Sequence, residues 1–289
     1  MLKLFTDTDC DVTPEIAAQY GYGLISMPYA IDGRTVYPYE DFETFDARAF
    51  YDQLRNGALP NTSAISRERY MEIFEPVFAN GDDILYVHFS RAMTATFDAM
   101  DQAVAELRQR YPGRKLYEID TKGITIVSLN IALEVGDMVK AGKPVAEILE
   151  WAKAEVDRFA IYFFADDLKF FRHSGRVSGL AATMGTLLGV RPIIYMNSEG
   201  KMVSIGSERG RVRAINRLMQ YVKELGDDIK GHRVIVGHTD APEIAAEVAA
   251  RLKEQYGDDL QVQTVVVNPT TGGHCGPDGV GICFHAIHR

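Results

Sequence analysis

Short apolar segments alternate with longer amphipathic ones through the first half of the chain. An apolar run at residues 2–5 predicts a strand, and a helix follows it with Thr13 as its N-cap and Pro14 at its first position. Apolar runs at residues 84–89 and 115–119 predict two further strands. A helical pattern follows each of them, and such alternation is typical of a mainly parallel sheet covered by helices.

The helices after these strands are indicated by the spacing of their apolar residues. In residues 94–111, apolar side chains recur at intervals of three and four positions, as at Phe97, Met100 and Val104. Residues 124–140 predict the next helix. Because parallel strands need a crossover connection, these helices are expected to lie on the faces of the sheet.

The pattern changes after a helix predicted for residues 145–159. Residues 161–165 and 192–196 predict strands, and residues 202–204 predict a short one after a turn. Polar and apolar residues alternate through 260–267, which is typical of a strand in a sheet with one solvated face. The second half is therefore expected to contain a mixed or antiparallel sheet.

The fold class predicted from these patterns is α/β with two domains, at residues 1–155 and 156–289. A length of 289 residues suffices for two ordinary domains, and 46% of hydrophobic residues suffices for a core. The N-terminal domain should hold the mainly parallel sheet with flanking helices. Residues 180–190 are rich in small and apolar side chains, so they predict a helix that packs on the second domain or lines an apolar cavity.

Charge and cysteine usage narrow the class of protein. A net charge of −9 argues against a nucleic-acid partner, since duplex binders present a basic face. The cysteines, Cys10, Cys275 and Cys283, form no disulfide framework and fit a reducing compartment. No signal-peptide pattern and no apolar run of about 20 residues is present, so we expect a cytoplasmic protein without a membrane segment.

One basic cluster stands out in this acidic chain, at Arg209, Arg211, Arg213 and Arg217. Taken alone, the cluster has two interpretations. It is either a solvated helix face or a docking patch for an acidic partner protein.

Polar stretches stand at the predicted ends of elements, where open α/β sheets bind their ligands. They are residues 7–11, 61–63, 90–96 and 272–276. A hydrolase triad could be assembled from Ser90, His274 and Asp9. However, no serine lies in the Gly-x-Ser-x-Gly elbow that α/β hydrolases use to expose their nucleophile.

Metal and nucleotide sites have weaker support. Asp7, Asp9 and Asp11 alternate along the chain and could bind a hard cation, but capping of the following helix is favoured because the calcium-loop pattern is absent. His274 and its neighbours lack zinc-ligand spacing. Nucleotide-binding glycine motifs are absent, and residues 276–281 are expected to form a turn between two strands.

Several of these stretches, taken in order, resemble the DegV family, and the resemblance covers nearly the whole chain. Residues 5–12 look like the family's Asp-Ser-Thr-Ala-Asp-Leu opening, and residues 60–64 are similar to its Pro-Thr-Thr-Ser-Gln segment. Residues 90–97 match its Ser-Ser-Gly-Leu-Ser-Gly-Thr-Tyr stretch in part. Three further segments resemble its Gly-Gly-Arg-Ile, Lys-Pro-Ile-Leu and Thr-His-Thr-Gly-Pro-Gly blocks: residues 174–179, 191–194 and 273–279.

The resemblance implies a DegV-like lipid-binding protein that holds a long-chain fatty acid, such as palmitate, in a buried apolar tunnel between the domains. Hydroxyls and a histidine of the family hold the carboxylate, and by position these are Thr62 or Ser63, Ser90 and His274. Arg91 stands where the family has a second serine, so it either contacts the carboxylate or points away. No cofactor and no metal is implied.

Family members of this kind act as the carrier subunit of a bacterial fatty-acid kinase, which phosphorylates the bound carboxylate to an acyl phosphate. The resemblance therefore implies a carrier that is not itself an enzyme, with the arginines from 209 to 217 as a candidate docking surface for the kinase. The alternative is an α/β enzyme, of hydrolase or phosphotransfer type, that acts on a small acid or sugar.

Overall fold

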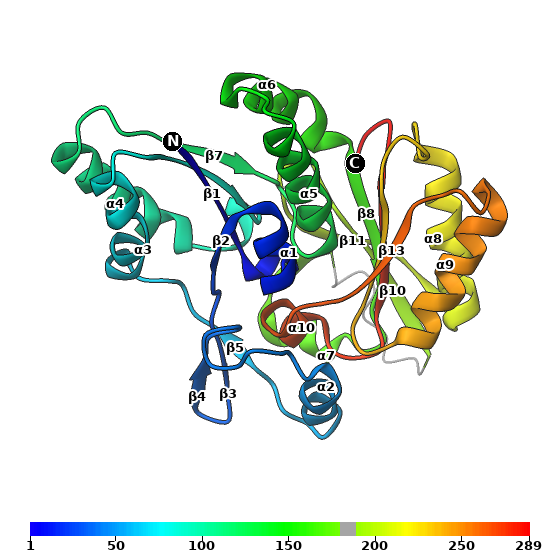
Figure 1. Cartoon of the computed structure of the whole chain (residues 1–289). Coiled ribbons are helices and arrows are strands. Elements are labelled where there is room, and N and C mark those ends of the chain that lie inside the picture. Colours follow the sequence, from blue (N-terminus) through cyan, green and yellow to red (C-terminus); the bar gives the residue numbers. More distant parts are fainter. Residues whose placement is uncertain (180–188) are drawn as a thin grey trace.

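Three β-sheets with their helices make up the computed structural model, which describes residues 1–179 and 189–289. A four-stranded sheet has the order β2-β1-β6-β7, a seven-stranded sheet has the order β13-β12-β14-β8-β10-β11-β9, and a three-stranded sheet has the order β4-β3-β5. Figure 1 shows the first sheet and its helices beside the second, with the small sheet below them. The helix predicted for residues 180–190 falls almost entirely outside the described residues.

The four-stranded sheet is entirely parallel, as the N-terminal pattern predicts. Helix α1 begins as expected, with Pro14 at its first position and the Thr13 hydroxyl accepting a hydrogen bond from the Ile16 amide at 3.4 Å. The elements of this part are β1 (Leu2–Asp7), α1 (Pro14–Tyr20), β2 (Tyr22–Ile25), α3 (Arg67–Ala79), β6 (Asp83–His88), α4 (Thr96–Arg110), β7 (Leu116–Asp120), α5 (Ile126–Lys140) and α6 (Val145–Glu155).

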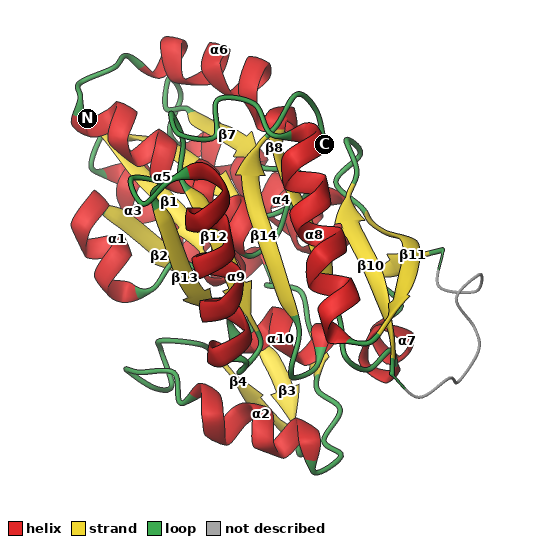
Figure 2. Ribbon diagram, turned by 90° about the vertical axis from the view of Figure 1, so that its right-hand side faces the viewer, coloured by secondary structure: helices red, strands yellow, loops and turns green. Residues whose placement is uncertain are grey.

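The seven-stranded sheet is mixed, which confirms the expectation for the second half. Strand β14 lies antiparallel between β12 and β8, and β13 pairs parallel with β12 at one edge. Helices α8 and α9 cover one face of this sheet (Figure 2). Its elements are β8 (Phe159–Phe164), α7 (Lys169–Ser174), β9 (Val177–Ser178), β10 (Val190–Met196), β11 (Met202–Arg209), α8 (Arg211–Leu225), β12 (Val234–His238), α9 (Pro242–Tyr256), β13 (Val262–Val266), α10 (Pro269–Cys275) and β14 (Val280–His285).

Helix α5 joins the two larger sheets into one packed body. It contacts α1 and the turn after β1 on one side and β8, β12 and β14 on the other. Most of its residues are buried, and one hydrophobic core runs from Leu4 of the first sheet to Ile235 and Cys283 of the second. The division at residues 155 and 156 stays a prediction, since the core continues across it.

The small antiparallel sheet was not predicted from the sequence. Its elements are β3 (Tyr29–Ile31), β4 (Arg34–Val36), α2 (Ala47–Arg55) and β5 (Asn61–Thr62). Arg55 of α2 ties this unit to the second half of the chain, because its guanidinium donates to Asp240 at 2.6 Å and to Asp278 at 2.9 Å. Strand β5 thereby holds Thr62 close to the C-terminal part of the chain.

Some element boundaries differ from the sequence prediction for identifiable reasons. Helix α6 ends at Glu155, since the apolar Phe159 is fully buried as the first residue of β8. A turn lies at residues 277–278 as expected, but it connects helix α10 to β14, so the prediction that a strand precedes it is wrong. Asn268 caps α10 and Pro269 occupies its first position, a helix start that the glycines obscured.

Among the helices of residues 1–179 and 189–289, none is both long and apolar enough to cross a membrane.

Candidate functional site

Two adjoining spaces lie where the three sheets meet. The first, the polar pocket, is lined by Asp9, Thr62, Ser63, Arg176, Thr270 and His274 together with apolar side chains. The second, the apolar cavity, is lined by Ile161, Phe163, Phe164, Met196, Met202 and Val280 among others, and encloses about 530 Å³ between atoms, its open part included. Ile124 lines both spaces, so the two adjoin at this side chain.

Helix α10 forms the wall that the two spaces share. Thr270 and His274 face the polar pocket, whereas Thr271 and Cys275 face the apolar cavity. The helix start is fixed from the N-terminal end of the chain: Asp11 accepts hydrogen bonds from the backbone and side-chain nitrogens of Asn268, at 2.9 and 2.7 Å.

The glycines of α10 let neighbouring elements approach closely. A Cβ atom on Gly272 would lie 2.2 Å from the Tyr51 hydroxyl, and one on Gly273 would lie 3.1 Å from Pro60. Because these two positions carry no Cβ atom, α10 can pack closely against Tyr51 and Pro60. This proximity brings His274 against the strand that carries Thr62.

His274 and Thr62 form the central polar contact of the pocket. The Thr62 hydroxyl lies 3.1 Å from Nε2 of His274. Burial, helped by the nearby positive charges of Arg176 and His173, lowers the pKa of His274 to about 4. The imidazole is therefore neutral near pH 7, and its buried Nδ1 has no partner among the described residues.

Arg176 brings a positive charge to the same pocket. It follows helix α7, and its guanidinium donates to the Ser174 carbonyl at 2.5 Å. The sequence interpretation did not select Arg176, although the segment 174–179 that resembles the family's Gly-Gly-Arg-Ile block contains it. This motif was the sequence signal that could have identified Arg176 as a pocket residue.

Ser63 lines the pocket as expected, whereas Ser90 and Arg91 do not. The Ser90 hydroxyl donates to the Gly200 carbonyl at 2.7 Å and accepts from the Ala92 amide at 3.2 Å. A hydrogen-bonded triad of Ser90, His274 and Asp9 is therefore not formed. The structure brings Thr62, Ser63 and His274 together and leaves Ser90 outside.

Arg91 points away from the polar pocket. Its guanidinium donates to both carboxylate oxygens of Asp101, at 2.9 and 3.1 Å, and to Glu118 at 2.6 Å. It also lies 5.2 Å from the centre of the Phe97 ring. Of the two possibilities that the sequence left open for Arg91, the structure favours the second.

Asp7 at the end of β1 and Asp9 and Asp11 after it are buried, but none of them caps helix α1, so that expectation is wrong. Asp7 accepts from the Tyr86 hydroxyl at 3.1 Å, Asp9 from Thr271 at 3.4 Å, and Asp11 from Asn268. The turn after β1 sends these side chains toward different partners. Within the described residues, no cluster of acidic, histidine and cysteine side chains has the arrangement of a metal site.

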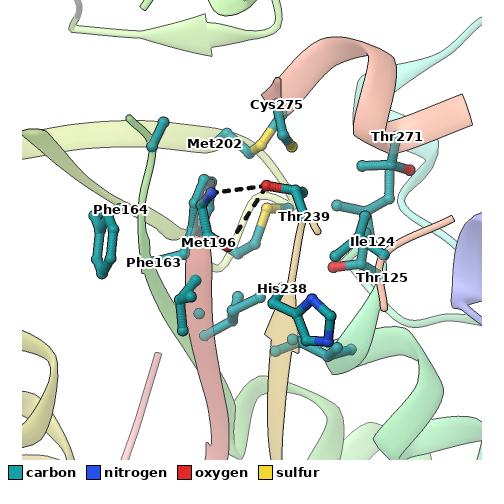
Figure 3. A pocket seen from close by; sticks show the side chains of 18 residues that line it. Ile124, Thr125, Phe163, Phe164, Met196, Met202, His238, Thr239, Thr271 and Cys275 are labelled. Atoms are coloured by element: carbon teal, nitrogen blue, oxygen red, sulfur yellow. Dashed lines mark hydrogen bonds between the residues drawn. The ribbon is translucent and has the colours of Figure 1, made fainter. Parts of the chain in front are cut away.

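The apolar cavity is formed by strands of the mixed sheet, which sequence patterns did not assign to a site. Figure 3 shows Phe163, Met196 and Met202 around it, with Thr239 hydrogen-bonded to the backbone. The Thr239 hydroxyl accepts from the Gly279 amide at 2.8 Å, so this polar group is already satisfied. The lining therefore suits a hydrocarbon chain.

The basic cluster spans two elements rather than one helix face. Arg209 is the last residue of β11, and the other three arginines lie on α8. Arg217 is paired with Glu208 at 3.0 Å. Arg209, Arg211 and Arg213 are exposed beside the exposed apolar side chain of Val212.

The fold and the site define an α/β protein with a polar pocket beside a cavity lined mainly by apolar side chains. The family model described as "Uncharacterised protein, DegV family COG1307" matches residues 1–286, and the chain belongs to the DegV family. A DegV domain-containing protein of Clostridium perfringens is 27% identical over 282 residues, which are 97% of this chain and 96% of that protein.

Solved structures of similar proteins share the whole fold. The DegV protein of Bacillus subtilis, described as a fatty acid binding protein, is 23% identical with a TM-score of 0.83, and 99% of each chain is covered. A stearic acid-binding protein of Eubacterium ventriosum is 20% identical with a TM-score of 0.87, over 99% of this chain and 98% of the other. The predicted fold class is thereby confirmed.

Proposed function

We propose that this protein binds one long-chain fatty acid, with the acyl chain in the apolar cavity and the carboxylate in the polar pocket. The observation that carries the proposal is that the two spaces adjoin at Ile124. Family membership supports it, since relatives of the same fold are described as binding fatty acids.

The energetics favour an acyl ligand. Burial of about 14 methylene groups is worth roughly 11 kcal/mol at ~0.8 kcal/mol each. Association entropy and ordering remove part of this gain, but enough remains for tight binding without a strong ionic contact. The head group then needs only satisfied hydrogen bonds to avoid the penalty of a buried charge.

The carboxylate is held by hydrogen bonds from Ser63 and His274, with Thr62 orienting the imidazole and Arg176 as the nearby positive charge. A carboxylate accepts hydrogen bonds only, so hydroxyl, imidazole and guanidinium donors match it. None of these groups needs to act as a nucleophile in this role. We therefore propose a carrier and not an enzyme, and its free cysteines suit the reducing conditions of the cytoplasm.

Mass spectrometry of lipids extracted from the purified protein tests this function. We expect a stoichiometric long-chain fatty acid, and thermal stabilisation when fatty acid is added to the delipidated protein. Recovery of no acyl chain, together with no stabilisation by fatty acids, would falsify the carrier function. An enzyme acting on a small acid or sugar would then become the favoured alternative.

We further propose that the carrier presents its fatty acid to a partner kinase, which forms the acyl phosphate. The exposed arginines of β11 and α8 lie beside Val212, which is 66% exposed. A positive patch with an apolar centre suits an acidic partner protein. This docking surface is named the basic patch and consists of Arg209, Arg211, Val212 and Arg213.

A further inference from the structure

Asp9 is the acidic side chain of the polar pocket. It is 6% exposed, and its carboxyl group accepts a hydrogen bond from the Thr271 hydroxyl at 3.4 Å. Within residues 1–179 and 189–289, no lysine, arginine or histidine lies within ion-pair distance of it. The proposed ligand would therefore place a second carboxyl group in a pocket that already holds one.

The charges facing Asp9 do not stabilise its ionised form. Asp7 and Asp11, on its own segment, are both buried, and His274 on α10 is neutral near pH 7. Burial, reinforced by the negative charges of Asp7 and Asp11, raises the pKa of Asp9 well above its usual range. Arg176 is the one cation lining the described part of the pocket, and it is not bonded to Asp9.

The charge balance in the pocket also favours the protonated form of Asp9. With Asp9 in its acid form, the positive Arg176 faces one negative ligand carboxylate. With Asp9 ionised, the same buried space would hold two carboxylates and one cation, and two carboxyl groups that share one site do not both ionise readily.

We propose that Asp9 remains protonated when the fatty acid binds and donates its O–H to the ligand carboxylate, so that the two carboxyl groups share one proton. This inference rests on the proposed function and adds a binding residue to it. No covalent bond changes, and the proton stays within the pair. Deprotonation of Asp9 as the pH rises through its pKa would remove the donor and set two anions against each other.

The test is the pH dependence of fatty-acid affinity, measured by displacement of a fluorescent long-chain fatty acid from the delipidated protein. Above the pKa of Asp9, the wild-type affinity should fall by about tenfold per pH unit, because binding then requires proton uptake. Asp9→Asn, whose amide donates at every pH, should bind within about threefold of the wild type at pH 6 and show no such fall.

Two further variants separate the donor from the shape of the side chain. Asp9→Thr supplies a hydroxyl that donates without ionising, so its affinity should also be independent of the pH. Asp82→Asn changes a buried aspartate that pairs with the N-terminal amine, away from the pocket, and should keep the wild-type pH profile. Circular dichroism at each pH confirms that every variant is folded.

The outcomes separate this inference from the proposed function. If the wild type binds fatty acid but its pH profile matches that of Asp9→Asn, the shared proton is refuted and the carrier function stands. If the wild type binds no fatty acid at any pH, the function itself fails. A loss of affinity in Asp9→Asn at pH 6 as large as in Asp9→Ala would also overturn the inference, since an amide donor should have replaced the acid.

Discussion

His274 is largely enclosed, neutral near pH 7 and hydrogen-bonded through only one of its two ring nitrogens. When the Thr62 hydroxyl donates to Nε2, the ring proton lies on Nδ1, and that atom has no partner among the described residues. A neutral imidazole in this form can donate one hydrogen bond to a carboxylate. It can do so without the pH sensitivity of a charged histidine, because its pKa lies near 4.

His274→Ala is therefore expected to weaken fatty-acid binding by about tenfold or more, the usual loss for a hydrogen bond to a charged group. Isothermal titration of the delipidated variant with palmitate measures it. His288→Ala removes an exposed histidine remote from the pocket and serves as the matched control. Unchanged affinity in His274→Ala would remove this residue from the head-group site.

The part of the site that sequence could predict is the part that rests on short motifs. Thr62, Ser63 and His274 were selected together and lie in one pocket. Ser90 was selected on the same grounds, yet its hydroxyl bonds to Gly200, which is 110 positions away in sequence. No local pattern encodes such a contact, because it depends on how β6 and the turn after β10 pack in three dimensions.

At the scale of elements, the chain was predictable where its pattern is local. The strand and helix starts of the N-terminal sheet follow from apolar spacing and from the Thr13 cap. Strand β11 was predicted only as residues 202–204 but extends to Arg209, because its outer residues are polar and carry no alternation strong enough to mark them. Its pairing with β10 along the whole length determines the strand instead.

The basic patch belongs to the junction of β11 and α8. Gly210 joins these elements with a φ of +85°, a conformation that favours glycine, and Arg209 and Arg211 on either side of it are both exposed. In the described part of the chain, no acidic side chain pairs with Arg209, Arg211 or Arg213, unlike Arg217 with Glu208. Their charge is thus free to attract an acidic partner.

Reversal of charge in the basic patch should impair transfer to the kinase and leave lipid binding intact. The variant Arg209→Glu with Arg213→Glu is expected to lower acyl-phosphate formation by about tenfold or more at low ionic strength, since it replaces attraction with repulsion. The rate of acyl-phosphate formation with a fatty-acid kinase and the fatty acid content of the carrier are measured in parallel.

Arg108→Glu on α4 is the control for this experiment, because Arg108 is also exposed but lies on the four-stranded-sheet side of the molecule. Equal rates for the two variants would show that the basic patch is not the kinase contact.

At the scale of the whole molecule, the site depends on contacts between the two ends of the chain. Asp11, just after the first strand, binds Asn268 at the start of α10, 257 positions away. The alternation of strands and helices in the sequence predicted both large sheets. It could not predict that α5 would pack against both of them, or that a third sheet would supply Thr62. Long-range packing of this kind leaves no periodic signal in the sequence.

The buried carboxyl group of Asp11, which accepts hydrogen bonds from Asn268, should make the free energy of unfolding depend on pH. Asp11 is buried, and burial raises its pKa to about 7 from 3.8, with the hydrogen bonds from Asn268 opposing that rise. A carboxyl group whose pKa is higher in the folded than in the unfolded state stabilises the fold below the unfolded pKa, and this contribution is lost as the pH rises through the folded value. The loss therefore falls between about pH 4 and about pH 7.

Asp11→Asn keeps an oxygen to accept from Asn268 but cannot ionise, so it lacks this penalty. Between pH 4 and pH 8, the free energy of unfolding of the wild type should fall relative to that of Asp11→Asn by up to about 4 kcal/mol, the equivalent of about three pKa units. Urea denaturation at several pH values measures the difference, with the exposed Asp258→Asn as the control. Parallel stability curves for the wild type and Asp11→Asn would contradict the expected coupling, because the Asp11 carboxyl would then ionise as readily in the folded protein as in the unfolded chain.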